Sequence, residues 1–290
     1  MDGWQAAIII AKAVTYGASL AAPGGALFLL LFGDRLTQDE QTAIRRVAVI
    51  GLVIGAVVSI ARIPLTTGML ADGFSGMANE TLIGIVLRAG EGSALVLRLV
   101  GFGIVAAGLL INRLRFAGTV TGIAFVCVSY AMVGHSEAAT PRLVAQGLLI
   151  LHLLCLTYWI GALYPLRRLT ASPDTSRVAA VVVGFSAIAL YVVGILIIAG
   201  AFLLWILLGT PSAILTSEYG RLVLVKLALV ALLLGLAALN KLRLTPQLQN
   251  GNAGAAAGLR RSITLEMILV ALILLVTATF TSIVGPPTLD

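Results

Sequence analysis

Both histidines of this chain, His135 and His152, lie only 17 positions apart in a sequence dominated by apolar residues. Cys155 follows His152 by three positions, so the two share one face of a helix. Met132 precedes His135 by the same spacing, about one helical turn. Imidazole, thiol and thioether groups suit soft copper, particularly Cu(I), and suit magnesium or calcium poorly. These four side chains are therefore the candidate metal ligands, and Glu137 is close enough to add an oxygen.

Each of these residues also has an ordinary structural interpretation. A single buried histidine is more often a hydrogen-bonded packing residue than a ligand, and a buried cysteine commonly acts as a small apolar side chain. If the loop after Gly134 stays at the membrane surface, the helical rise places His135 and His152 about 10 to 15 Å apart. One ion could then not bind both. Either that loop dips into the bundle, or the two histidines are separate stations on one path.

The composition places these residues in a membrane. Of the 290 residues, 60% are hydrophobic and 11% charged, and the mean hydropathy is +1.08. Soluble domains carry roughly 25% charged residues, so the lipid bilayer is the expected surrounding. The apolar runs do not alternate with polar residues, which favours helices over a barrel. The net charge of +7 falls mostly in short loops and does not predict nucleic-acid binding. No nucleotide-binding loop is present, and we expect no enzymatic activity.

Eight helices are expected, and a short extra helix is a further prediction for Asn79 to Leu87. The predicted spans are Trp4 to Phe32, Arg46 to Ile63, Ser93 to Ile111, Phe116 to Val133, Arg142 to Leu166, Ser176 to Leu208, Tyr219 to Leu239, and Arg260 to Val284. One set of connecting loops carries twelve Lys and Arg residues and the other five. Because the richer side faces the cytoplasm, both termini and the loop with His135 are predicted to be periplasmic.

An internal repeat relates the two halves of the chain. The segment "GSALVLRLVGFGIVAAGLLINRLR" from Gly92 aligns without gaps with "GRLVLVKLALVALLLGLAALNKLR" from Gly220. The ends "SYAMVGH" and "TFTSIVGP" of the following helices are also alike. We interpret residues 1–133 and 134–290 as two four-helix repeats within one membrane domain. Four helices return the chain to the same side, so the repeats are parallel.

Several polar residues lie inside the predicted helices. Arg98 and Lys226 are equivalent in the repeat, and each lies roughly 9 Å below the glycine that opens its helix. A structural role near the outer surface is the preferred interpretation of both, over a direct role in transport. Trp159 shares the helical face of His152 and Cys155. Glu266 either pairs with Arg260 or Arg261 or takes up protons, and pairing is the preferred interpretation.

The second half resembles the CopD/PcoD copper-resistance inner-membrane proteins. The likeness lies in "LHLLCLTYWIGAL" (151–163), "SEYGRLVLVKLALVALLLGLAALNKLRLTPQL" (217–248), "RRSITLEMILVALILL" (260–275) and the "VGHS" before the fifth helix. It is specific because polar residues recur at fixed places within apolar helices. The resemblance implies an eight-helix inner-membrane protein of copper homeostasis. It further implies copper movement across the membrane, usually import, beside a periplasmic CopC-type partner.

The interpretation is copper transport from the periplasm through the bundle, and two other classes remain open. The first is a redox protein in which two histidines ligate a b-type haem. That arrangement needs both histidines at similar depth, whereas His135 is predicted at a helix end and His152 near mid-membrane. The second is a membrane docking partner or sensor for a periplasmic copper protein. A docking partner would bind copper without letting it cross.

Overall fold

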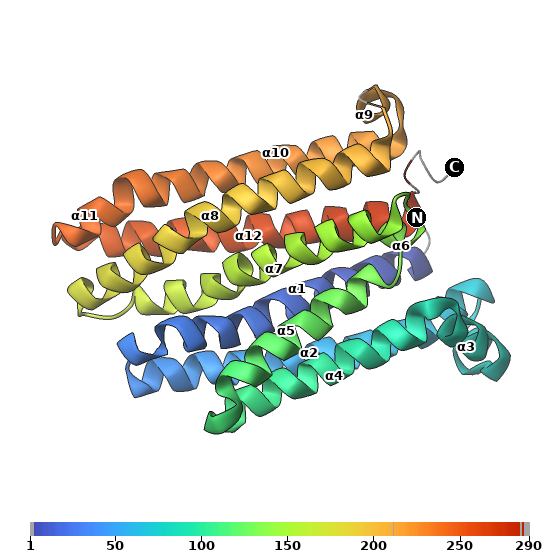
Figure 1. Ribbon diagram of the computed structural model, residues 1–290, viewed down its shortest axis with the longest axis horizontal. Helices are drawn as coiled ribbons and strands as arrows, with labels where there is room; N and C mark the ends of the chain where they lie inside the picture. The colour runs from blue at the N-terminus through green and yellow to red at the C-terminus, as the bar shows by residue number, and fades with distance from the viewer. Residues whose placement is uncertain (1–2, 211, 285, 287–290) are drawn as a thin grey trace.

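The computed structural model describes residues 3–210, 212–284 and 286 (Figure 1). Every regular element within these ranges is a helix, and eight helical segments are long and apolar enough to cross a membrane. The predicted all-α membrane fold with eight spans is confirmed. The short extra helix predicted near Asn79 is also present.

The first half of the chain contains five α-helices and four short 3₁₀ or π segments. They are α1 (Gly3–Phe32), η1 (Gly33–Arg35), α2 (Gln38–Leu70), η2 (Phe74–Ala78), α3 (Glu80–Val86), η3 (Leu87–Glu91), α4 (Gly92–Leu110), η4 (Asn112–Leu114) and α5 (Arg115–Ala131). The second half contains α6 (His135–Ala138), α7 (Arg142–Leu169), α8 (Thr175–Leu208), α9 (Ala213–Thr216), α10 (Glu218–Leu239), η5 (Asn240–Leu244), α11 (Thr245–Gln249) and α12 (Ala253–Ile283).

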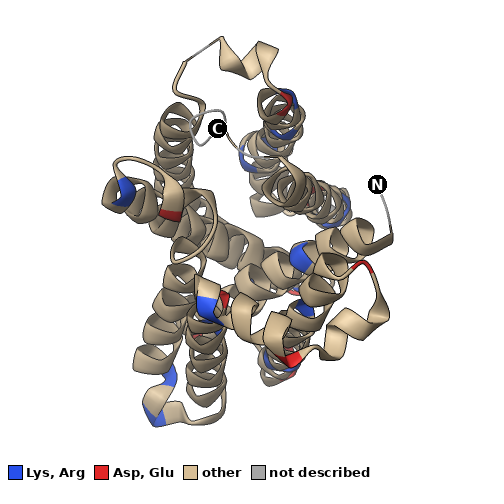
Figure 2. Cartoon of the chain, turned by 90° about the vertical axis from the view of Figure 1, so that its right-hand side faces the viewer, with Lys and Arg blue, Asp and Glu red and all other residues tan. Residues whose placement is uncertain are grey.

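The start of α1 and the end of α12 lie at the same end of the bundle, together with α3, α6 and α9 (Figure 1). We call this the outer end. The opposite inner end carries the α1–α2, α4–α5 and α7–α8 connections and α11. Figure 2 looks onto the outer end and shows Lys, Arg, Asp and Glu positions as sparse patches along ribbons that are otherwise uncharged. The loops with the larger share of Lys and Arg all belong to the inner end.

Two helices begin well before the predicted residues because polar caps extend them. Helix α2 starts at Gln38, where Thr37 and Glu40 form a reciprocal capping box. Such a box satisfies two backbone N–H groups that the first turn would otherwise leave unpaired. Helix α12 starts at Ala253, because the side chain of Asn252 accepts a hydrogen bond from the backbone of Gly254. Hydropathy marks only the lipid-spanning part and misses these polar first turns.

Glycines set the closest helix crossings. Gly24 of α1 and Gly161 of α7 meet backbone to backbone, so a side chain at either would overlap the other helix. In the first half, α4 and α5 also pack through glycines. A Cβ atom on Gly101 would lie 3.0 Å from the carbonyl oxygen of Gly122. Small residues allow such approach in membranes, where packing rather than water drives helix association.

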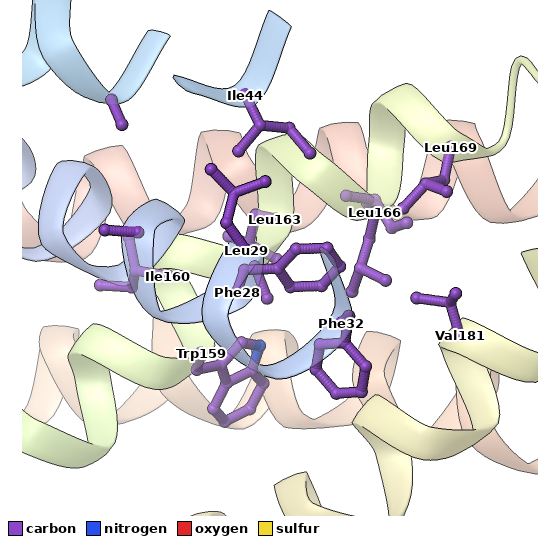
Figure 3. Packing of buried hydrophobic residues seen from close by; sticks show 14 of the residues in the cluster. Phe28, Leu29, Phe32, Ile44, Trp159, Ile160, Leu163, Leu166, Leu169 and Val181 are labelled. Atoms are coloured by element: carbon purple, nitrogen blue, oxygen red, sulfur yellow. The ribbon is translucent and has the colours of Figure 1, made fainter. Parts of the chain in front are cut away.

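The main apolar core lies towards the inner end. Figure 3 shows side chains of α1, α2, α7 and α8 converging there. The labelled residues are Phe28, Leu29 and Phe32 of α1, Ile44 of α2, Trp159, Ile160, Leu163, Leu166 and Leu169 of α7, and Val181 of α8. This packing closes the inner half of the bundle, whereas the polar residues Lys12, Arg98 and Lys226 lie in the outer half.

The duplication stays a prediction, and the contacts between the first and last helices of the two halves can be compared. In a duplicate, α1 would correspond to α7, and α5 to α12. Helices α1 and α7 pack on each other. Helix α1 also packs on α12, and α7 packs on α5, so each first helix contacts the last helix of the other half.

A buried ion pair joins the two halves at the inner end. Arg177 of α8 donates from Nη1 to Glu40 Oε2 at 2.8 Å and from Nη2 to Oε1 at 3.0 Å. Glu40 is only 5% exposed. A planar guanidinium suits this two-point contact with a carboxylate. The pair therefore fixes the start of α8 against the start of α2.

Replacing Arg177 with methionine should lower the free energy of unfolding by about 2 kcal/mol, because Glu40 would remain buried without its partner. The lower midpoint of thermal unfolding in detergent would measure this loss. Arg221→Met is the matched control, since the Arg221–Glu218 pair is 3.7 Å long and largely exposed. Exposed pairs contribute little, so the control should change stability by no more than about 0.5 kcal/mol. Equal midpoints for the two variants would contradict the prediction.

Candidate functional site

His135 opens the short helix α6 at the outer end. Gly134 precedes it with φ of 79°, a conformation that favours glycine and turns the chain sharply. The imidazole packs edge-on against Tyr219 of α10, with ring centroids 6.0 Å apart. Its Nε2 atom is buried without a hydrogen-bond partner in the described part of the chain. Burial, together with the positive charge of Lys12, holds the pKa of His135 below its ordinary 6.5, so the neutral metal-binding form prevails at neutral pH.

Two expectations about the neighbours of His135 are wrong. Met132 does not share a helical face with His135, because α5 ends at Ala131 and Gly134 breaks the chain direction. Glu137 is not free to bind an ion alongside His135. Its Oε2 atom pairs with Arg142 Nε at 2.7 Å and accepts a hydrogen bond from Gln146 Nε2 at 2.9 Å. Met132 itself is 36% exposed at the outer end, so it remains accessible from solution.

His152 lies in α7, ten residues or roughly 15 Å below the start of that helix. Its ring packs against Gly200 of α8, where a methyl group would lie 3.3 Å from the imidazole Nδ1. That nitrogen is buried and makes no hydrogen bond of good geometry in the described residues. The backbone of Leu196, one turn before Gly200 on α8, nevertheless offers the imidazole a hydrogen bond. Cys155 is 6% exposed and one turn further along α7. The glycine of α8 thus makes room for the imidazole beside the backbone of Leu196.

A row of packed side chains leads inward from His135 as far as Lys226. Tyr219 contacts His135 on one side and Phe280 of α12 on the other. The ring centroids of Tyr219 and Phe280 are 5.2 Å apart. The Nζ atom of Lys226 lies 5.7 Å from the centre of the Phe280 ring. Lys226 in turn acts electrostatically on His152. We call His135, Tyr219, Phe280, Lys226 and His152 the histidine row.

The row separates the two histidines, so the structure does not bring the four predicted ligands into one site. Over residues 3–210, 212–284 and 286, no group of three or more His, Cys, Asp or Glu side chains is arranged to hold a metal ion. The interpretation of two stations at different depths therefore fits the arrangement better than one shared ion. Sparse ligands of this kind permit exchange of an ion rather than tight storage.

Arg98 has the contacts of a structural brace. It is 2% exposed, donates from Nε to Ser129 Oγ at 3.2 Å, and lies over the ring of Tyr130 at 4.2 Å. The Tyr130 hydroxyl donates to Ser19 Oγ at 2.8 Å. Arg98 therefore links α4 to α5 and, through Tyr130, to α1. These contacts favour the structural interpretation over a role in transport.

Arg98 and Lys226 make matching contacts in the two halves. Each cation lies over an aromatic ring, Tyr130 for Arg98 and Phe280 for Lys226. Tyr130 stands four residues before the glycine of "SYAMVGH" and Phe280 five before that of "TFTSIVGP", so the two places are similar but one residue out of register. The similarity of these ends was the available sequence signal for both aromatic residues. Tyr219 belongs to the stretch 217–248 that carries the family resemblance, although its contact with His135 was not predicted, and Gly200 carried no signal.

The expected pairing of Glu266 with Arg260 or Arg261 is wrong. Arg260 is bonded to Thr170 at the end of α7, with Nη2 2.6 Å from the carbonyl oxygen. Glu266 instead accepts a hydrogen bond from Trp159 Nε1 at 3.5 Å and another from Asn240 Nδ2. Helical rotation explains the difference, because Glu266 faces inward and Arg260 reaches along the surface. Trp159 therefore donates its indole N–H to the buried carboxylate of Glu266.

Comparison with protein families covers most of the chain. Residues 179–280 match the family model described as copper resistance protein D. Residues 1–143 match the model described as copper resistance protein D-like, N-terminal domain. The chain belongs to the CopD copper-resistance family. No curated protein matches it, and no solved structure does.

The two matches contain part of the candidate site. The CopD match contains Lys226, Glu266 and Phe280, and the N-terminal match contains Arg98, Met132 and His135. His152, Cys155 and Trp159 fall between the matched ranges, on α7. This CopD protein is thus a copper-resistance membrane protein, and α7 is the helix that joins its two matched regions.

Proposed function

We propose that this CopD protein moves copper across the bacterial inner membrane, inward from the periplasm. Copper, the cargo, would bind first at His135, with Met132 accessible nearby, and then at His152 and Cys155. The observation that carries the proposal is the buried Nε2 atom of His135 at the outer end, which has no hydrogen-bond partner in the described residues. Buried polar atoms are nearly always partnered, so this exception supports a ligand at His135.

The inward direction rests on orientation and packing. We assign the Lys- and Arg-rich inner end to the cytoplasm. His135, the start of α1 and the end of α12 would then lie on the periplasmic side. The apolar core closes the inner half, so copper at His152 would need a helix movement to leave. Lys226, within the histidine row, would discourage uncontrolled passage of cations. Movement would therefore proceed by ligand exchange and conformational change.

A periplasmic copper-binding protein of the CopC type is the proposed donor. Helix α6 is the feature that would receive the ion, because His135 lies at the outer end, three residues after the exposed Met132. Soft thioether and imidazole groups at that surface would allow copper to pass directly between proteins.

Copper uptake by proteoliposomes tests the proposal. Purified protein in vesicles that contain a copper-sensitive dye should admit externally added Cu(I) faster than protein-free vesicles do. The same preparation should be titrated with Cu(I) to measure binding. Binding without any passage of copper into the vesicles would refute transport and leave a docking or sensing role.

A further inference from the structure

Glu266 is a buried carboxylate held by neutral groups. It is 3% exposed and lies where α12 packs on α7 and α10. Its two oxygens accept from Trp159 Nε1 of α7 and Asn240 Nδ2 of η5. Neither donor carries a charge. An ionised carboxylate taken out of water is costly unless a cation accompanies it.

No cation accompanies Glu266 in the described residues. Of the elements packed on α12, α1 has a single charged residue, Lys12, which is at the outer end and bonded to Thr281. The charged residues of α10 are Glu218, Arg221 and Lys226, all on its outer part. The charged side chains of the inner end nearest in sequence to this site are exposed and make no ion pair with Glu266: Arg167, Arg168, Lys241, Arg243, Arg260 and Arg261.

Both the ionised and the protonated form of Glu266 can find hydrogen-bond partners at this site. The ionised form accepts hydrogen bonds only, and Trp159 and Asn240 supply two donors. The protonated form needs an acceptor for its O–H. Asn240 Oδ1 is buried and lacks a hydrogen-bond partner among the described residues. Rotation of the Asn240 amide would turn this oxygen towards Glu266 and the N–H₂ group away.

Glu40 provides an internal comparison. It is 5% exposed, nearly as buried as Glu266, and also belongs to the inner end. Its two oxygens bind the guanidinium of Arg177. That pairing keeps Glu40 ionised, whereas Glu266 has only neutral donors and an acceptor that is free in the described structure.

From this geometry we infer that Glu266, with Asn240 and Trp159, forms a reversible proton-binding site in the inner half of the bundle. Trp159 lies on α7, two turns beyond His152, so a movement of α7 alters the histidine row and the carboxyl site together. The further step, that proton uptake and release at Glu266 accompany copper movement, rests on the proposed function. Proton binding itself does not.

Infrared difference spectroscopy tests the proton site without any copper. At a pH where exposed carboxyl groups, with ordinary pKa values of about 4, are already ionised, the purified protein should still show the C=O stretch of a protonated carboxylic acid. This band should disappear reversibly as pH rises further. Glu266→Gln should remove this titrating band completely. Glu266→Asp should retain a titrating band, and so should the control Glu40→Gln. Size-exclusion elution at the wild-type volume would establish that each variant is folded.

A missing band in the wild type, or a band unchanged in Glu266→Gln, would overturn the inference.

The coupling between copper movement and proton movement is measured in proteoliposomes that contain a pH-sensitive dye. Copper movement by the wild type should change the internal pH, and Glu266→Gln should abolish that pH change. Copper movement with no pH change in the wild type would overturn the coupling. Absence of copper movement would refute transport instead, and the infrared band would still decide the proton site.

Discussion

Simultaneous replacement of His135 and His152 with alanine should reduce copper uptake by proteoliposomes more than about 10-fold. Even residues that only orient a metal ligand change affinity by 10- to 100-fold, so loss of both imidazoles should cost at least that much. His135 Nε2 makes no hydrogen bond within the described structure, and His152 has only a backbone contact at Leu196, so the fold should survive. The midpoint of thermal unfolding should accordingly remain close to that of the wild type.

The two cysteines supply a matched control for this experiment. Both are free and buried, Cys127 on α5 and Cys155 on α7. Only Cys155 follows His152 by one helical turn, so Cys155→Ala should slow copper uptake and Cys127→Ala should not. Full uptake by the double histidine variant, or equal losses in the two cysteine variants, would remove the histidine row from the mechanism.

Gly161→Ala should destabilise the bundle by about 3 kcal/mol or more, at the upper limit of ordinary overpacking. A Cβ atom at this position would overlap the backbone of Gly24, and neither helix can yield by rotating a side chain. Because α1 and α7 are the central crossing of the two halves, both would have to separate. The expected result is a much lower midpoint of thermal unfolding and a smaller yield of folded protein.

Gly147→Ala is the control on the same helix. A Cβ atom at Gly147 would meet nothing within 4 Å, so this substitution should change stability by less than about 0.5 kcal/mol. The contrast separates a packing effect from any general effect of removing glycine from α7. Equal stability of the two variants would show that the close crossing of α1 and α7 is not required.

Hydropathy was sufficient to predict the fold, and it failed at helix ends. The eight apolar runs are spans because lipid cannot satisfy an open backbone, which leaves few other solutions. The start of α2 was placed eight residues too late, since Thr37 and Glu40 extend it through polar contacts. A cap depends on local hydrogen bonds rather than on average apolarity, and its effect is hard to predict from a hydropathy window.

Site residues of a rare type could be predicted from the sequence. Contacts between residues far apart in the sequence could not. His135 and His152 stood out because imidazoles are rare in this chain. The partners of Glu266 were missed, since Trp159 and Asn240 lie 107 and 26 positions away and meet it only after packing. The Met132–His135 pairing failed for a local reason, the positive φ of Gly134. Regular helical spacing cannot be extended across such a turn.

Anomalous scattering at the copper absorption edge, recorded from crystals of copper-loaded protein, tests the account most directly. It predicts copper within bonding distance of His135 Nε2, of His152 Nδ1, or of both in separate positions. Copper bound only elsewhere, with both imidazoles bare in fully loaded crystals, would contradict a route through the histidine row.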